Sequence, residues 1–490
     1  ALTILAGFTA LFISIYRSKD LLFVSRSKAL LIYFIGFLLV LLPIELGSSL
    51  AWIYNSLDPH YPFDGEPRWI LPSIETQLFN IGYWATPLLL LMLLFAWIYV
   101  PVLKTLFLRP VRRIWTARSS NHGELGGQRG RLSSHPAWFS FLAKSGPKLL
   151  LFLSFLLSIY IVYYPYFYEE RLIGIDTARW YYPVLRGMND WESVKGMVQS
   201  YGGPYFLLLF FLKMATGFDS LFIVKIGPAL PAILLAFSSY IFLRIAVKNE
   251  WLAAVGSMLS VFSIHTTVGM FAGIFVSWLA MSEVMLFFAF FLKGSETRYR
   301  TLWAALAVVM SFLLLLTYLW TWGVVMAVVA AYLLLAFLRW RLAARKPELK
   351  REFIFTVMVL AFCTAPILLV LLAPPLIPSG VRAVASNLPT VSVIFSSMSL
   401  SFLGNVWNIL VFTITYYVGG FFANPLTYLL GFLGMFKLSR HESCTGRILL
   451  LWVALISVGS VLTDSWYQWR LLYLLPFQIF ALFGLKVLID

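Results

Sequence analysis

The chain has 490 residues, of which 61% are hydrophobic and only 12% are charged. A soluble domain has about a quarter of its residues charged, so this composition excludes an ordinary soluble protein. The formal net charge of +16 does not indicate nucleic-acid binding, because the basic residues lie in short links between apolar segments. The two cysteines, Cys363 and Cys444, provide neither a disulfide framework nor a CxxC metal site.

The first 108 residues are predicted to form an N-terminal module of three membrane-spanning helices, of which Leu30–Trp52 is one. An apolar segment of about 20 residues is long enough to cross a hydrocarbon core of about 30 Å as a helix. These helices could cover the rest of the protein or bind a partner subunit. A polar and strongly basic linker follows over 109–147, and we expect it to be cytoplasmic.

Residues 148–490 are predicted to form a membrane domain of about ten further helices, which gives about thirteen spans in all. The segments Leu149–Tyr168, Leu221–Leu243 and Phe353–Leu372 have the length and composition of such spans. A β-barrel would need stretches of about ten residues with alternating polarity, and the sequence has none. The fold class is therefore predicted to be all-α, a polytopic membrane protein.

Basic links predict how the chain is oriented in the membrane, because cytoplasmic links carry an excess of Lys and Arg. The strongly basic links are Arg17–Lys28, Arg109–Lys148, Lys293–Arg300 and Arg339–Arg351. The links between them are then outside, including Tyr168–Ser220 and the turns around His265 and Trp320. This alternation places the C-terminus in the cytoplasm of an integral, multi-pass cell-membrane protein.

Two segments do not suit a simple span. Gly203–Thr216 is short and follows the helix breaker Gly202-Gly203-Pro204, which predicts an interfacial or re-entrant helix in the long outer link. Val406–Leu438 contains Gly419-Gly420 and Asn424-Pro425, which predicts a broken helix.

Asp176 lies in the long outer link, after a cluster of interfacial aromatic residues. With Thr177 it has the pattern of a helix start, in which a short polar cap precedes helix formers. One interpretation is that Asp176 only caps this helix. The other is that a carboxylate at the outer membrane face takes a proton from an acceptor hydroxyl, which is the placement that general-base catalysis requires.

Several features follow one another from Lys148 onward. An outward-leading span precedes Asp176, an aromatic amphipathic helix, a Gly-Pro-Tyr segment and the segment Gly217–Leu230. The C-terminal run Trp469–Gln478 includes Arg470, Tyr473 and Pro476. In this order of features, residues 148–490 resemble archaeal-type integral-membrane GT-C glycosyltransferases. That superfamily includes protein O-mannosyltransferases, aminoarabinose transferases and oligosaccharyltransferases.

The resemblance implies that a sugar moves, with inversion, from a polyprenyl-phosphate donor such as dolichyl phosphate to a protein, glycan or lipid acceptor on the extracytoplasmic side. Asp176 would be the base. The phosphate leaving group needs a cation near the outer interface, for which Arg470, at the predicted outer start of the last span, is the first candidate. A snorkelling interfacial arginine is the alternative for Arg470.

Arg179 and Arg186 are further candidates for binding phosphate, or they pair with nearby acids such as Asp190. His265 occupies the place where many members carry a second-loop acid, and it is either a polar turn residue or a catalytic or metal-binding one. A ligand set for a divalent cation cannot be assembled from the sequence, so we expect no metal site and assign no cofactor.

Aromatic residues near the outer links either belong to the interfacial aromatic belt or stack on a sugar. They are Trp180, Tyr181, Trp320, Trp466, Tyr467 and Trp469. Glu283 lies in the middle of a span, where an ionisable group is costly and marks either a functional site or a structural hydrogen bond.

Two other functions fit the same sequence. A transporter or flippase for a lipid or polysaccharide would use Glu283 and the broken helix near Gly419 as its pathway. A non-catalytic membrane scaffold would use the N-terminal spans to bind its partner.

Overall fold

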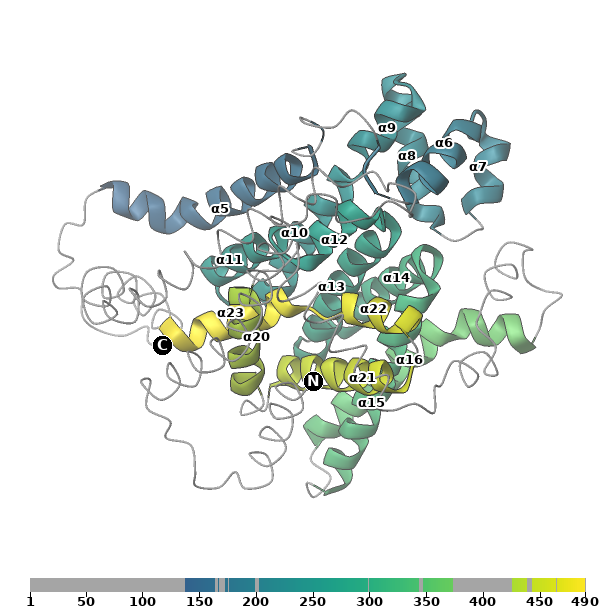
Figure 1. Cartoon of the computed structure of the whole chain (residues 1–490). Coiled ribbons are helices and arrows are strands. Elements are labelled where there is room, and N and C mark those ends of the chain that lie inside the picture. The colour runs from purple at the N-terminus through teal and green to yellow at the C-terminus, as the bar shows by residue number, and fades with distance from the viewer. Residues whose placement is uncertain are drawn as a thin grey trace, which may run out of the picture.

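The computed structural model describes residues 137–163, 166, 172–174, 176–198, 202–297, 299–342, 347–372, 425–438, 443–463 and 465–489. The elements within these residues are helices (Figure 1). The predicted N-terminal spans, most of the predicted linker, and the segment 373–424 with the first half of the predicted broken helix lie outside the described residues.

Seven helical segments of the described part are long and apolar enough to cross a membrane. They are Ser145–Tyr163, Ser220–Val247, Glu250–Met270, Phe275–Glu296, Arg300–Thr317, Leu319–Arg341 and Pro347–Leu368. Shorter apolar helices cover Gly203–Thr216, Cys444–Ser460 and Phe477–Val487. The chain is therefore an all-α, multi-pass membrane protein, as predicted. The total of thirteen spans and the sidedness stay predictions.

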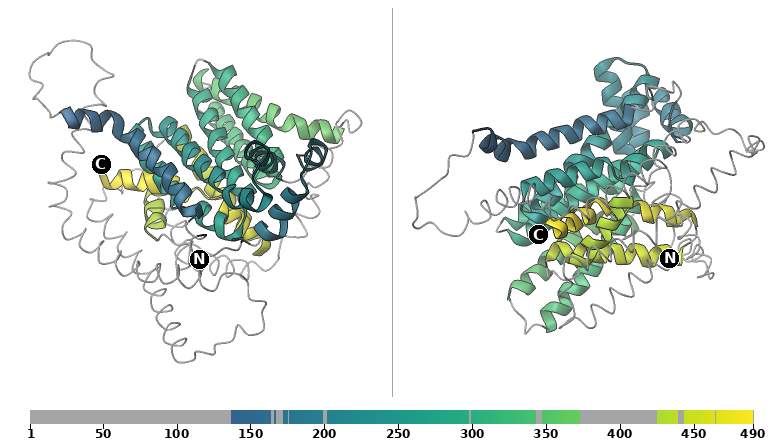
Figure 2. Two further views of the ribbon diagram at one scale, coloured as in Figure 1. Left: turned by 90° about the horizontal axis from the view of Figure 1, so that it is seen from above. Right: turned by 60° about the vertical axis from the view of Figure 1, so that its left-hand side comes forward.

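The first long helix, α5 (Ala137–Tyr163), begins within the predicted linker and lies along one edge of the molecule (Figure 2). A group of short helices follows, which we call the Asp176 module. It consists of the π-helix η4 (Thr177–Tyr181), α6 (Tyr182–Gly187), α7 (Trp191–Val198), α8 (Gly203–Thr216) and α9 (Ser220–Ile226). Lys213 of α8 holds the module together, because its Nζ donates to the backbone oxygens of Leu185 and Met188 at 3.2 and 2.9 Å.

The helix bundle comes next in the chain. Its first part consists of α10 (Ala229–Val247), α11 (Glu250–Val261), α12 (Ile264–Ala272), α13 (Phe275–Glu296), α14 (Arg300–Thr317), α15 (Leu319–Leu342) and α16 (Pro347–Leu372). Its last part consists of α20 (Pro425–Leu438), α21 (Cys444–Leu462), α22 (Ser465–Tyr473) and α23 (Phe477–Ile489). The Asp176 module projects beyond one end of this bundle (Figure 1).

Helix α13 forms the centre of the bundle. It packs against α10 and α14 along its length, and α12, α15, α16 and α8 also contact it. Nearly all of its side chains are buried, including Trp278, Phe287, Phe288 and Phe291. A helix that is apolar on all sides belongs in such a central position, because no face of it needs water.

One break differs from the sequence prediction. The predicted span Leu221–Leu243 lies within the candidate span Ser220–Val247, which a turn at Gly227-Pro228 divides into α9 and α10. The predicted last span is split at Pro476, because proline lacks a backbone N–H and cannot continue the hydrogen bonds of a helix. Arg470 therefore lies on the separate short helix α22, and not at the start of a continuous last span.

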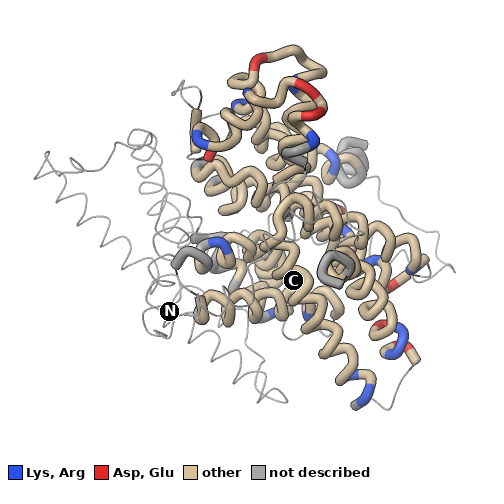
Figure 3. The backbone as a smooth tube through the Cα atoms, turned by 90° about the vertical axis from the view of Figure 1, so that its right-hand side faces the viewer, with Lys and Arg blue, Asp and Glu red and all other residues tan. Residues whose placement is uncertain are grey.

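Charged residues gather on the Asp176 module and at the opposite ends of the long helices, while most of the bundle between them is uncharged (Figure 3). At those opposite ends, Lys248 pairs with Glu296 at 2.9 Å and Arg244 pairs with Glu250 at 2.8 Å. These ends carry the links 293–300 and 339–351, which the sequence predicts to be cytoplasmic.

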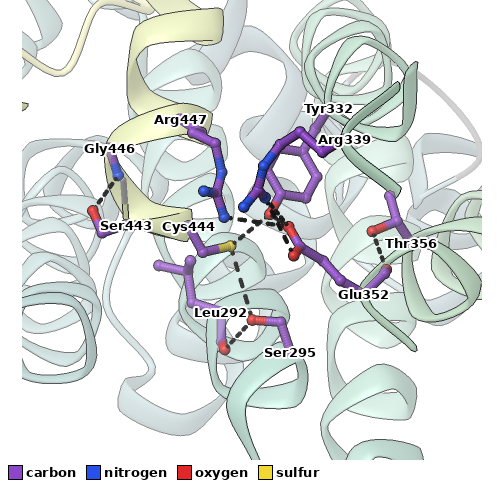
Figure 4. A network of polar contacts seen from close by, with 10 residues as sticks. All are labelled: Leu292, Ser295, Tyr332, Arg339, Glu352, Thr356, Ser443, Cys444, Gly446 and Arg447. Atoms are coloured by element: carbon purple, nitrogen blue, oxygen red, sulfur yellow. Dashed lines mark hydrogen bonds and ion pairs between the residues drawn. The ribbon is translucent and has the colours of Figure 1, made fainter. Parts of the chain in front are cut away.

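One carboxylate joins three helices at this end of the bundle (Figure 4). Glu352 of α16 accepts hydrogen bonds from the hydroxyl of Tyr332 and from Arg339, both on α15. It also pairs with Arg447 of α21, with 3.3 Å between Arg447 Nη2 and Glu352 Oε1. The Cys444 thiol lies 3.0 Å from the Tyr332 hydroxyl and extends the network. Glu352 is 17% exposed, so this carboxylate is largely removed from water.

Helices α20 and α23 cross with their backbones in contact. A Cβ on Gly434 would lie 1.8 Å from the backbone oxygen of Phe480, and one on Gly484 would lie 1.9 Å from that of Leu430. Small residues allow such close packing between membrane helices.

We expect Gly484→Ala to lower the stability of the purified protein by roughly 1–3 kcal/mol or more, because the added methyl overlaps backbone atoms. Gly323→Ala on α15 is the control, since a Cβ there meets no atom within 4 Å. It should leave stability unchanged or raise it by up to about 1 kcal/mol. Thermal unfolding in detergent measures both, and equal effects of the two variants would contradict the observed crossing.

Glu352→Gln should lower the free energy of unfolding by at least about 1 kcal/mol, because two arginines lose their counter-charge. The upper limit is the roughly 3–5 kcal/mol that is lost when a fully buried ion pair is broken. Glu348→Gln, at an exposed position on the first turn of α16, should change stability by no more than about 0.5 kcal/mol. The same unfolding measurement compares them. A Glu352→Gln protein as stable as Glu348→Gln would show that the network does not hold α15, α16 and α21 together.

Candidate functional site

Two glycines hold the segment that carries Asp176 against the turn between α12 and α13. Gly174 and Gly273 have φ angles of +93° and +73°, which favour glycine. A Cβ on Gly273 would lie 2.8 Å from Thr177 Oγ1 and 3.3 Å from the backbone nitrogen of Asp176. The start of η4 is thus fixed by direct backbone contact with the α12–α13 turn.

The next turn of the module is anchored by Tyr181. Its hydroxyl accepts a hydrogen bond from the backbone N–H of Val276 at 3.2 Å, at the beginning of α13. Its ring lies 5.0 Å from Phe275 and 5.4 Å from Tyr205, measured between centroids. Tyr181 is 1% exposed. It therefore positions η4 and does not offer its ring to a sugar, in contrast to the prediction. Trp180 packs against Phe206 and remains partly exposed.

Asp176 occupies the N-cap position of η4, but its side chain makes no capping hydrogen bond. Its backbone is already helical, with φ −71° and ψ −22°, whereas a capping residue normally has extended backbone angles. Of the two interpretations that the sequence left open, simple capping is therefore not supported. The carboxylate is available for interactions with other groups.

The electrostatic surroundings of Asp176 combine burial with two cations. Burial raises the pKa of this carboxyl above its ordinary 3.8, and the nearby charges of Arg470 and then Arg179 oppose that shift. Arg470 comes from α22, almost at the other end of the described chain. The structure thus brings together Asp176, Arg470 and Arg179. Arg186 lies at the exposed end of α6.

Helix α12 connects the two parts of this site. The hydroxyl of Tyr473, three residues after Arg470 on α22, donates to the backbone oxygen of His265 at 2.8 Å. A Cβ on Gly269 would lie 3.1 Å from the same hydroxyl. His265, Gly269 and Gly273 are four residues apart, so they share one face of α12. One end of this face holds α22, and the other holds the segment of Asp176.

The sequence predicts His265 in a link between two helices. The structure instead places it at the beginning of helix α12. It is fully buried, and its ring lies 4.9 Å from that of Tyr473. The turn between α12 and α13 is at Gly273 instead, because the left-handed conformation of this glycine ends the helix. Within the described ranges, three or more His, Cys, Asp or Glu side chains are nowhere grouped to hold a metal ion.

The remaining predicted residues lie in different places. Trp466, Tyr467 and Trp469 are on α22 with Arg470, and Trp320 is partly buried in the first turn of α15. Glu283 is buried in the interior of α13, where Thr317 at the end of α14 donates a hydrogen bond to it.

The sequence does not predict the roles of Gly174, Gly273 and Tyr473. Glycines beside a polar loop are a weak signal for a close backbone contact, and the apolar run around Tyr473 has the pattern of one continuous span. Their roles depend on contacts between distant segments.

Asp176→Asn should unfold at the same temperature as the wild type or higher at pH 7. Because the folded protein raises the pKa of Asp176, the unfolded chain loses this proton first, and stability falls as the pH rises through that range. Asparagine carries no charge and removes this penalty. Asp190→Asn is the control, because hydrogen bonds from Ser193 lower the pKa of Asp190, whose charge therefore favours folding. This control should be no more stable than the wild type. Clear destabilisation by Asp176→Asn would contradict the expected sign.

No protein-family model matches the chain, and no curated protein matches it either. Any assignment of function therefore rests on the residues and the geometry described above.

Proposed function

We propose that the protein is a membrane glycosyltransferase that moves a sugar from a polyprenyl-phosphate donor to an acceptor hydroxyl on the predicted outer side. The observation that carries this proposal is the convergence of Asp176 with Arg470 and Arg179 at the end of the bundle where the Asp176 module lies. A carboxylate that makes no capping bond suits proton removal beside a departing phosphate when burial raises its pKa and the charges of two guanidinium groups oppose that rise.

The proposed reaction uses each group once. The acceptor hydroxyl gives its proton to the Asp176 carboxylate while its oxygen attacks the anomeric carbon of the sugar. The bond between that carbon and the phosphate oxygen breaks, and polyprenyl phosphate leaves with the electron pair. Arg470, with Arg179, stabilises the negative charge of the leaving phosphate, because guanidinium groups match phosphate oxygens in geometry and charge.

The position of the site suits a lipid-linked donor. The Asp176 module carries exposed apolar side chains on α8 and α9, among them Phe211, Met214 and Phe222. The site therefore adjoins surfaces on which a polyprenyl chain can lie. Protein, glycan and lipid acceptors all offer the hydroxyl that the reaction requires.

Transfer can be tested with purified protein in liposomes, using labelled polyprenyl-phosphate mannose and measuring the release of polyprenyl phosphate in the presence of a membrane extract. Asp176→Asn should lower the rate by about 10²–10⁴-fold, which is the usual contribution of a general base. Arg470→Gln should lower the rate and move the acidic limb of the pH profile to higher pH, because Arg470 lowers the pKa of Asp176.

Lys195→Gln is the control for charge, since this exposed lysine of α7 pairs only loosely with Glu192, at 3.8 Å. It should leave both the rate and the pH profile unchanged. Full activity of Asp176→Asn would overturn the assigned base. Movement of the labelled lipid across the membrane without any glycosidic product would favour a transporter instead.

A further inference from the structure

Glu283 is an acidic residue in the middle of the most deeply buried helix, and the proposed reaction does not use it. It is 8% exposed. Thr317 Oγ1, at the end of α14, donates a hydrogen bond to Glu283 Oε1 at 2.9 Å. The other oxygen, Oε2, has no hydrogen-bond partner within the described part of the chain.

The pairing with Thr317 shows how deep Glu283 lies. Phe275, the first residue of α13, precedes Glu283 by eight residues, or about 12 Å at a rise of 1.5 Å per residue. Helix α14 ends at Thr317, level with Glu283. The turn from α14 to α15 is therefore recessed by about 12 Å below the end of α13 that holds the Asp176 module.

Cations on the helices around α13 lie near helix ends. They are Arg244 of α10, Arg300 of α14, Arg339 and Arg341 of α15, Lys350 and Arg351 of α16, Arg447 of α21, Lys213 of α8 and, on α13 itself, Lys293. Arg300 begins α14 and is seventeen residues from Thr317, about 25 Å along the helix. Arg244 lies near the far end of α13, as the neighbouring pair Lys248–Glu296 shows. Arg339 is bound to Glu352, and Lys213 to the backbone of α6.

The titratable side chains in the interior of these helices are tyrosines, a histidine and a cysteine, residue types that are wholly or mostly uncharged at neutral pH. They are Tyr205 of α8, Tyr240 of α10, His265 of α12, Tyr318 between α14 and α15, Tyr332 of α15 and Cys363 of α16. The Tyr332 hydroxyl is hydrogen-bonded to Glu352, and the His265 ring packs against Tyr473. The described helices therefore place no positive charge at the depth of Glu283 that could pair with an ionised carboxylate there.

An ionised carboxylate in such surroundings would be very costly, since an isolated charge inside a membrane protein needs a partner or must be neutralised. A protonated carboxyl avoids this cost. Its carbonyl oxygen accepts the hydrogen bond that Thr317 donates, and its hydroxyl corresponds to Oε2.

We propose that Glu283 is a proton-binding site inside the bundle, whose carboxyl carries an exchangeable proton in the folded protein at neutral pH. In this step the Glu283 carboxylate binds one proton from water, and the neutral carboxyl later returns that proton to water. The turn at Tyr318 directly follows Thr317, which bonds Glu283, and Tyr318 lies close enough to Tyr181 of the Asp176 module to act on it electrostatically.

This site does not depend on the proposed sugar transfer. A protein that fails every transfer assay can still carry the proton, and an active enzyme can lack it. A membrane-embedded exchangeable proton would equally serve proton-coupled movement of a substrate.

Infrared spectroscopy of the whole purified protein in lipid at pH 7 tests the proposal. A carbonyl band of a protonated carboxylic acid should be present, should shift to lower frequency in D₂O, and should be lost in Glu283→Gln. Glu352→Gln is the matched control: this buried glutamate is paired with two arginines, so its replacement should remove a carboxylate band and leave the acid band in place.

Thr317→Val keeps Glu283 and removes the hydrogen bond to its carbonyl oxygen, so it should shift the acid band to higher frequency. This variant also provides the test if Glu283→Gln does not fold. The proposal is overturned if Glu283→Gln removes a carboxylate band, or if Thr317→Val leaves the acid band of the folded protein unmoved.

Discussion

Helix α13 is enclosed by other helices along nearly its whole length, and this enclosure is the constraint on which the rest of the described structure depends. Most of its side chains are buried, so the neighbouring helices must fill the space around them. Phe288 meets Trp452 of α21, Phe291 meets Phe355 of α16, and Gly294 leaves room for the same phenylalanine. The positions of the surrounding helices follow from these contacts. The same enclosure requires a neighbouring helix to provide a partner for the buried carboxyl of Glu283.

The Asp176 module is attached to the beginning of this central helix. Tyr181 bonds the backbone of Val276, and Gly273 allows the segment of Asp176 to touch the turn just before α13. Helix α12 then extends the attachment to α22 through Tyr473. The charge of Arg470 acts on Asp176 because the segments of both residues contact α12 and the turn that follows it. The geometry of the candidate site therefore depends on the packing in the core of the bundle.

Three carboxyl groups that are partly or fully removed from bulk water differ in the partners that surround them. Glu352 is paired with two arginines and a tyrosine hydroxyl, an arrangement that suits a fixed structural charge. Asp176 is partly buried beside two arginines, with burial the stronger influence on its pKa. This balance leaves its proton affinity open to change by a bound phosphate, which would compete for the same cations. Glu283 has only a threonine hydroxyl as its described partner. Its surroundings favour the neutral form, because they offer no positive charge.

The sequence by itself determined that the chain is a helical, multi-pass membrane protein, since hydrocarbon forces each segment to satisfy its backbone locally and local composition reveals this. It also singled out Asp176, Arg470 and Glu283 as polar residues in need of explanation. Only the tertiary structure decided that Asp176 makes no capping bond, that Arg470 and Arg179 act on it, and that Tyr181 is buried as an anchor. It likewise moved His265 from a turn into α12 and separated α22 from α23 at Pro476. These properties come from contacts between segments far apart in the chain, and a hydrophobicity pattern, which is local, does not contain them.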